Sequence, residues 1–314
     1  MSEKNYSVYI LVSSNKAMAQ FPDYLSQANP RTEIDEDKIR LFDSEDDFNF
    51  LGVELFKEIA VLGAPIACSI HKDEDGNTIP FDMDTAPIVG NLVRYTKLSN
   101  ALLEQFVQKR TETATIIFRC LAETFVNLKY FINYKDAHTT RHYIKKSLVL
   151  EKDLIEIIKR NVSDAGQSKA IEDRMIKSIT KTFKISKFEF EQVNNSIKWD
   201  AKIKAKIKEI LHPDFYVLIY GTASHAVHGN WQDLIIHHLD EYEDGFLPKA
   251  NWTYPTLQMI ESATAISCNL WHDYISNVQD HGDERDKLLA HIMDIRNRCK
   301  KLGEAHEEFK QSKP

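Results

Sequence analysis

Apolar residues recur three and four positions apart through most of the chain after Thr85. This spacing places them on one face of an α-helix, and it continues with few interruptions to about residue 303. The pattern therefore predicts a mainly α fold, a multi-helix bundle. The expected helices cover residues 88–107, 111–134, 138–161, 169–195, 201–211, 214–228, 255–280 and 284–303.

Residues 1–84 follow a different pattern. Residues 6–12 are rich in β-branched and aromatic side chains, which favours a short strand, whereas residues 48–62 carry an apolar helical face. The turn Asp75-Gly76-Asn77 predicts a further strand or hairpin over residues 67–81. We expect three parts: a small α+β or irregular region (1–84), a helical bundle domain (85–303) and a charged tail (304–314).

Composition supports a globular protein without a membrane segment. Of the 314 residues, 43% are hydrophobic and 28% are charged, which is ordinary for a folded domain. No run approaches 18 uncharged apolar residues, and the N-terminus lacks the basic-then-apolar order of a signal peptide. A cytoplasmic location is expected. The four cysteines are far apart, which argues against a disulfide framework or a zinc-cysteine site.

Charge is distributed unevenly. The net charge of −7 argues against a protein that coats nucleic acid indiscriminately, yet residues 31–58 carry −6 and residues 169–208 carry +6. Within the basic segment, four bases recur along one expected helix: Arg174, Lys177, Lys181 and Lys184. They form either a stripe suited to a phosphate backbone or an ordinary solvated helix face.

The segment around residue 225 concentrates polar chemistry on one helix. Tyr220, Ser224 and His228 are spaced four apart and therefore share a face, with His225 three residues before His228. Gly229 is placed to end the helix. A core-facing helix has no need of so many polar groups on one stripe, so the segment predicts a functional pocket.

A second polar stripe lies on the expected helix at 111–134. Arg119, Glu123 and Asn127 are also spaced four apart. Taken alone, an arginine four residues before a glutamate is typical of a surface ion pair that contributes only about 0.3–0.5 kcal/mol.

Together the two stripes resemble a bacterial helical family of unknown function. Its members typically show Arg-Ser-Leu-x-Glu and then Tyr-x-x-Leu-Ser-x-x-Val-His, in the same order and at a similar spacing as Arg119 to Glu123 and Tyr220 to His228. Cys120 and Ala223 depart from that pattern, and His225 is additional. The resemblance covers about residues 85–280 and implies a shared helical fold with an Arg/Glu/His pocket.

More distantly, a helical bundle that pairs arginine with histidine resembles the HEPN superfamily. Many of its members are metal-independent ribonucleases of toxin and anti-phage systems, with histidine four to six residues after arginine, and their sites are often built across two protomers. The resemblance thus implies an RNA substrate and a homodimer. The formal match here is Arg285 and His291, a secondary candidate pair or a charged helix face.

A ribonuclease site would divide its tasks among these residues. Histidine suits the transfer of protons to and from ribose oxygens, which assigns His225 and His228, and arginine suits phosphate, which assigns Arg119. Glu123 would orient one of them. Tyr220, Ser224 and Asn127 would hold substrate, and the basic stripe would carry the RNA backbone.

Three alternatives remain open. The Arg/Glu/His cluster could be a structural polar network, with His228 at a helix C-terminus. The protein could be a non-enzymatic nucleotide- or anion-binding module whose residues 1–84 dock a protein partner. The third alternative is a metal site, in which Glu123 joins histidines from the set His225, His228, His237, His238 and His272. The sequence lacks the Glu-x-x-His motif that is typical of di-iron bundles. We expect neither metal nor cofactor, because the phosphate-loop, dinucleotide, hydrolase-elbow and zinc-protease motifs are missing as well.

Overall fold

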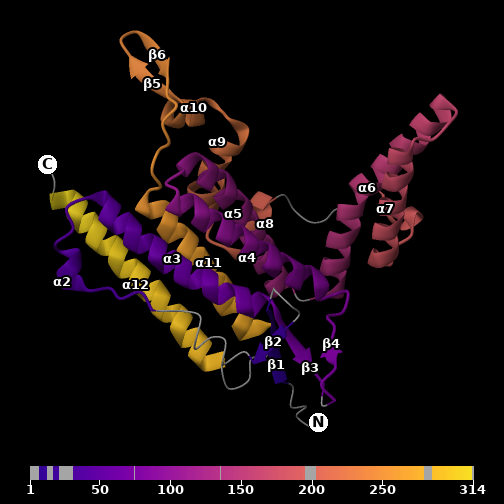
Figure 1. Cartoon of the computed structure of the whole chain (residues 1–314), viewed down its shortest axis with the longest axis horizontal. Helices are drawn as coiled ribbons and strands as arrows, with labels where there is room; N and C mark the ends of the chain where they lie inside the picture. Colours follow the sequence, from indigo (N-terminus) through magenta and orange to yellow (C-terminus); the bar gives the residue numbers. More distant parts are fainter. Residues whose placement is uncertain are drawn as a thin grey trace.

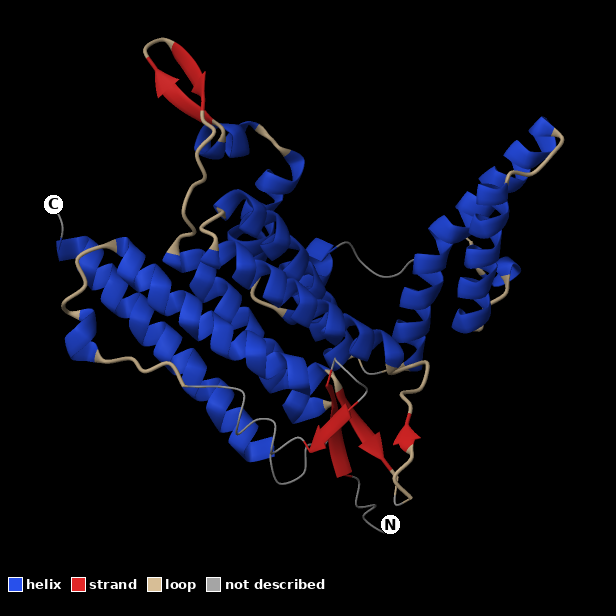
Figure 2. Ribbon diagram, in the orientation of Figure 1, coloured by secondary structure: helices blue, strands red, loops and turns tan. Residues whose placement is uncertain are grey.

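The computed structural model describes residues 7–12, 17–20, 31–73, 75–134, 136–194, 203–278 and 285–312. It consists of a body of long helices from which two segments project (Figure 1). The fold is mainly α with few strands, as Figure 2 shows, which confirms the predicted multi-helix bundle. Several predicted ends, at residues 6, 195, 201, 280 and 284, lie outside the described residues.

Five long helices form the body. They are α3 (Glu45–Ala67), α4 (Ala86–Val107), α5 (Thr111–Asn133), α11 (Leu257–Asn277) and α12 (Arg285–Ser312). Their apolar faces enclose one main core, with Tyr95, Phe56, Phe125 and Trp271 almost fully buried. Each of these helices is therefore stabilised by tertiary burial rather than by its own propensity.

Close contact between α3 and α11 depends on a small residue. A Cβ added to Gly63 would lie 2.6 Å from the indole ring of Trp271, closer than real side-chain contacts allow. Gly63 thus lets the largest buried side chain of α11 lie directly on the α3 backbone.

A small antiparallel sheet lies at one end of the body. Its order is β2-β1-β3-β4, built from β1 (Ser7–Val12), β2 (Ala17–Gln20), β3 (Ser69–Lys72) and β4 (Thr78–Ile79). The strand predicted over 6–12 and the hairpin predicted over 67–81 are confirmed in β1 and in the β3–β4 pair.

The segment before residue 85 shares the core of the bundle. Helix α3 packs against α4, α11 and α12, and the short α2 (Glu36–Ile39) buries Ile39 beside α3 and α12. At the other end, α12 continues through 304–312, so a helix occupies most of the predicted tail. That residues 1–84 and 85–303 are separate domains, each able to fold independently, stays a prediction.

A helical hairpin projects from the body. It consists of α6 (Ala137–Ala165), α7 (Ala170–Ser186) and the 3₁₀ turn η1 (Phe190–Gln192), and it has its own core, which includes Leu148 and Phe183 (Figure 1). The helix predicted to continue to residue 195 ends earlier. Lys187 adopts a left-handed φ of 57°, and its amide closes the last turn as a helix cap.

The remaining elements lead into the second projection. Helix α8 (Ile203–Ile210) is followed by a π-helix, η2 (Tyr216–Gly221), and by α9 (Thr222–His228). The sequence pattern missed α10 (Trp231–His237) and the hairpin of β5 (Leu239–Tyr242) and β6 (Gly245–Pro248). Among the described residues, no helix combines the length and apolar character needed to cross a membrane.

Candidate functional site

Arg119 on α5 is the centre of a polar cluster that joins α5 to α9. Its Nε donates to Ser224 Oγ at 2.9 Å and its Nη1 donates to Glu123 Oε2 at 2.8 Å. Its Cζ lies 3.2 Å from the ring centroid of Tyr220, an arrangement of cation over aromatic ring. The structure therefore brings together four of the residues singled out in the sequence: Arg119, Glu123, Tyr220 and Ser224.

Burial differs sharply within this cluster. The Arg119 side chain is 14% exposed, whereas the Glu123 side chain is 50% exposed. The pair therefore resembles neither a fully solvated surface ion pair nor a buried one. Glu123 and the outer edge of the cluster are accessible to a ligand, while Arg119 is fixed in position by its neighbours.

A π-helix sets the position of Tyr220. The Thr222 hydroxyl donates to the carbonyl of Val217, five residues earlier, at 2.9 Å, in keeping with the wider turn. A Cβ on Gly221 would lie 3.0 Å from the Tyr216 carbonyl oxygen, so glycine relieves crowding there. In this turn Tyr216 and Tyr220 stack, with ring centroids 5.5 Å apart. Single π-turns inside α-helices are frequent at functional sites.

The two imidazoles of α9 have different surroundings. His225 Nδ1 lies 2.5 Å from Asn230 Nδ2, so His225 is tied to the start of α10. His228 is exposed and occupies the last turn of α9, which ends at Gly229 with a φ of 55°. Within the described residues, His228 has no hydrogen-bond or ion-pair partner. It is the more accessible of the two candidate proton carriers.

Asn127 has a separate partner further along α5. Its Oδ1 accepts a hydrogen bond of 2.8 Å from Lys206 Nζ on α8, and Lys206 is buried. The stripe of Arg119, Glu123 and Asn127 predicted from the sequence thus contacts two elements: α9 through Arg119 and α8 through Asn127. This contact fixes the amide of Asn127 against α8.

The secondary pair is divided between different partners. Arg285 Nη2 donates to the Ser276 carbonyl at 3.2 Å. His291 Nε2 lies 3.3 Å from Glu58 Oε1, and Glu58 is a buried carboxylate that also accepts two 2.8 Å hydrogen bonds from Arg298. No contact between Arg285 and His291 occurs among the described residues, so this pair has the surroundings of a structural network.

The basic stripe lies on the helical hairpin. Arg174, Lys177, Lys181 and Lys184 are all exposed on α7, and none forms an ion pair within the described part of the chain. Helix α7 packs on α6, and the hairpin projects away from α5 and α9 (Figure 1). The stripe is therefore not part of the Arg119 cluster.

The histidines considered as metal ligands are dispersed. His237 Nδ1 lies 3.0 Å from Thr253 Oγ1 and 3.8 Å from Glu112 Oε1, and burial lowers the pKa of His237. His238 and His272 contact the carboxylates of other residues. No three histidine, cysteine or carboxylate side chains converge as a metal site in the described residues.

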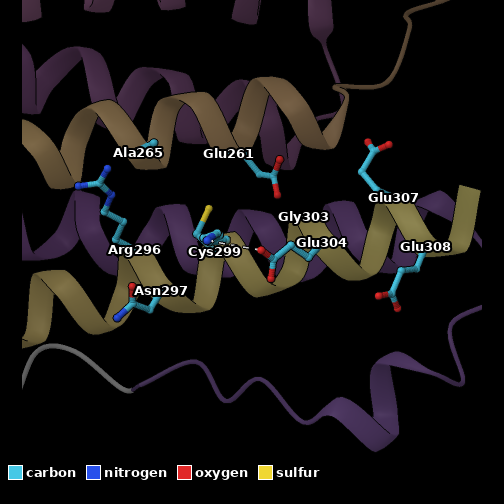
Figure 3. Close-up of a pocket in the computed structure, with 10 residues that line it drawn as sticks. Glu261, Ala265, Arg296, Asn297, Cys299, Gly303, Glu304, Glu307 and Glu308 are labelled. Carbon is cyan, nitrogen blue, oxygen red and sulfur yellow. Dashed lines mark ion pairs between the residues drawn. The ribbon is translucent and has the colours of Figure 1, made fainter.

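Sequence reasoning missed a groove between α11 and α12. It has a volume of about 670 Å³, and Glu261, Cys299, Gly303, Glu304 and Glu307 line it (Figure 3). Burial raises the pKa of Glu261 to about 7, and the neighbouring Glu307 adds to the shift. The sequence signal for this groove is the acidic run at residues 304–308. Its composition alone predicts a charged tail, whereas in the structure these residues continue α12.

The fold and the site define a mainly α-helical protein with an Arg/Glu/Tyr/Ser cluster between two helices. The sequence profile of one protein family matches residues 85–246, about half of the chain, and covers every member of this cluster. The chain belongs to that family, described as Family of unknown function (DUF5677). No curated protein and no solved structure matches the chain.

Proposed function

We propose that this protein is a HEPN-like, metal-independent endoribonuclease of the cytoplasm, an effector of a bacterial defence or toxin system. The observation that carries the proposal is the exposed His228 at the end of α9, the helix whose Ser224 accepts a hydrogen bond from Arg119. The helix that carries this accessible imidazole is thus the one that Arg119 contacts one turn earlier, at Ser224.

The chemistry requires only groups that this cluster supplies. The ribose 2′-hydroxyl loses its proton to an imidazole and attacks the adjacent phosphorus, and the P–O5′ bond breaks as the 5′-oxygen gains a proton. His228 and His225 carry these protons, because an imidazole can both accept and donate a proton. Arg119 stabilises the negative charge that develops on the phosphate.

The supporting residues act through position. Glu123 accepts from Arg119 and keeps the guanidinium plane over Tyr220. Ser224 accepts from Arg119 and donates to the Tyr220 carbonyl at 2.7 Å, so its hydroxyl links the two groups. Arg119 is mostly buried and His228 is exposed, so we assign the phosphate to the fixed guanidinium and the proton transfer to the accessible imidazole.

The test is RNA cleavage by the purified protein in the presence of EDTA. Mixed tRNA and mRNA are incubated with the wild type, His228→Ala, His225→Ala and Arg119→Ala. We expect cleavage by the wild type and a loss of at least about 100-fold in His228→Ala, the usual contribution of a general acid or base. A matched control is His212→Ala, because His212 is also exposed, at 78%, and lies beside Asp214. Equal cleavage by His228→Ala and the control would overturn the assignment.

A second candidate is a non-enzymatic nucleotide- or anion-binding module. The observation in its favour is that two donors of Arg119 and one face of its guanidinium are already occupied within the chain. It predicts RNA or nucleotide binding without cleavage by the wild type. Binding that survives in His228→Ala but fails in Arg119→Ala would favour this module over the ribonuclease.

A further inference from the structure

Residues 229–251, here called the arm, stand out from the helical body (Figure 1). The arm contains α10 and the β5–β6 hairpin, a two-stranded sheet that pairs with no other strand among the described residues. An isolated two-stranded hairpin is only marginally stable in water. Its large apolar side chains that are more than a third exposed are Trp231, Ile235, Ile236, Tyr242, Phe246 and Leu247.

The strand register gives the hairpin two unlike faces. Phe246 lies opposite Glu241 and packs edge-on against Trp231, with ring centroids 5.4 Å apart. Tyr242 and Leu247 belong to the other face, where they are 55% and 48% exposed. One face therefore stabilises the arm internally, and the other offers apolar surface to a partner.

The arm is acidic. It carries five acids and only one base, Lys249, a net charge of −4. The acids are Asp233, Asp240, Glu241, Glu243 and Asp244. Such a surface repels a nucleic-acid backbone and favours a partner that combines basic and apolar groups.

The outer side of the α6–α7 hairpin has that combination. Residues 137–187 hold twelve lysines and arginines against six acids, a net charge of +6. One face of α7 carries two bases between two isoleucines: Ile171, Arg174, Lys181 and Ile185. The two isoleucines are 51% and 62% exposed. On α6, Leu150 is 76% exposed. The two projecting segments of this chain thus carry opposite net charges, and both expose large apolar side chains.

We propose that the arm of one copy docks on the outer face of the α6–α7 hairpin of a second copy, and that two copies exchange arms reciprocally. Within a single chain the arm and the hairpin project from separate parts of the body (Figure 1), so the contact requires another molecule. This proposal does not rest on the proposed function.

The surface available is of the right size for a dimer. A fully buried aromatic side chain covers about 150–250 Å². Six large side chains that are about half exposed therefore offer on the order of 500 Å² per arm. In a reciprocal exchange each copy buries an arm and a hairpin, so its contribution is about twice that area, which exceeds the roughly 800 Å² per partner of a stable interface. Reciprocal exchange uses two such contacts in each dimer.

The test uses charge reversal on each side of the contact. The arm variant is Asp240→Lys/Asp244→Lys, in which Asp240 lies opposite Leu247 on the face with Tyr242, and the hairpin variant is Arg174→Glu/Lys181→Glu. All four positions are exposed, so the helical content and the melting temperature of each variant should match those of the wild type. The matched control is Asp37→Lys/Glu308→Lys, which reverses two exposed acids away from the arm.

Sedimentation velocity of the full chain at micromolar concentration gives the readout. We expect the wild type and the control to be dimers, and each charge-reversal variant alone to be a monomer. In an equal mixture the reversed arm meets the reversed hairpin, so the two monomeric variants should form a heterodimer. A monomeric wild type, a dimer insensitive to both reversals, or no recovery on mixing would each overturn the proposal.

Discussion

The guanidinium of Arg119 lies over the ring of Tyr220, with 3.2 Å between its Cζ and the ring centroid. The two residues are about a hundred positions apart, on α5 and on the π-helix before α9. Ser224 accepts a hydrogen bond from the same guanidinium. Arg119 therefore contacts two residues that are one helical turn apart, Tyr220 and Ser224. The contact fixes the register of α9 against α5 and thereby the place of His228.

Removing the guanidinium should destabilise the protein measurably. Arg119→Ala loses a cation–ring contact and a charge-assisted hydrogen bond, so we expect the free energy of unfolding to fall by about 2–3 kcal/mol. Arg119→Lys should fall between this variant and the wild type, because lysine cannot reproduce the planar fork. Urea unfolding measures these losses, and the m values of the variants should equal that of the wild type.

The control for this variant is Arg141→Ala. Arg141 forms a surface ion pair with Asp84 at 3.1 Å and is 58% exposed, so its loss should cost less than about 1 kcal/mol. Equal losses in the two variants would mean that the Arg119 contacts contribute no more than a surface pair.

Helical spacing predicted the long elements well because that pattern is local. The helices α4 and α5 could be predicted from residues three and four apart. The grouping of Arg119 with Tyr220 and Ser224 could not be predicted from spacing, and only the family resemblance implied it. The π-turn could not, because it depends on Gly221 and on packing against α5. The spacing also did not predict that α3 packs into the same core as the bundle helices. Helix α3 precedes the predicted boundary at 84/85, yet its Gly63 lies against Trp271 of α11.

Substitution of His228 should leave stability unchanged. The side chain is exposed and has no polar partner in the described part of the chain, so His228→Ala should change the unfolding free energy by less than about 0.5 kcal/mol. Thermal melting beside the wild type checks this. A loss of several degrees would instead identify His228 as a structural cap of α9, and it would weaken the case for a catalytic role.

A buried ion pair fixes Thr32 to the body. Glu58 accepts two hydrogen bonds from Arg298, and its Oε2 also accepts from the backbone amide of Thr32 at 3.0 Å. Glu58→Gln removes the more deeply buried of the two carboxylates that Arg298 contacts, since Arg298 Nε also donates to Asp294 at 2.9 Å, and we expect a loss of about 3 kcal/mol. Chemical denaturation measures the loss, and faster hydrogen exchange at Thr32 should accompany it.

Two variants sharpen the test of the Glu58–Arg298 pair. Glu54→Gln removes the half-buried partner of the exposed Lys57 and should have little effect. The double variant Glu58→Gln/Arg298→Met removes both charges together and should recover part of the stability lost in Glu58→Gln. A double variant less stable than Glu58→Gln would show that Arg298 contributes mainly through other contacts, such as its hydrogen bond to the Thr32 carbonyl.

Glu261 should make stability depend on pH near neutrality. It lies against Gly303 in the groove between α11 and α12, where its Oε1 is buried and accepts no hydrogen bond from the described residues (Figure 3). Burial, with repulsion from Glu307, raises its pKa to about 7, whereas the unfolded chain titrates near the ordinary value. Between these values the folded state holds a proton that the unfolded state has released. Its stabilising contribution is therefore complete at low pH and disappears as the pH rises through about 7.

Glu261→Gln isolates this effect, because the amide cannot ionise. We expect the variant to match the wild type at about pH 5 and to be more stable than the wild type by about 1–2 kcal/mol at about pH 8. Chemical denaturation at both pH values measures the difference, with the exposed Glu308→Gln as the control expected to show none. A benefit of equal size at both pH values would contradict the prediction, since it would come from packing rather than from the charge that Glu261 acquires.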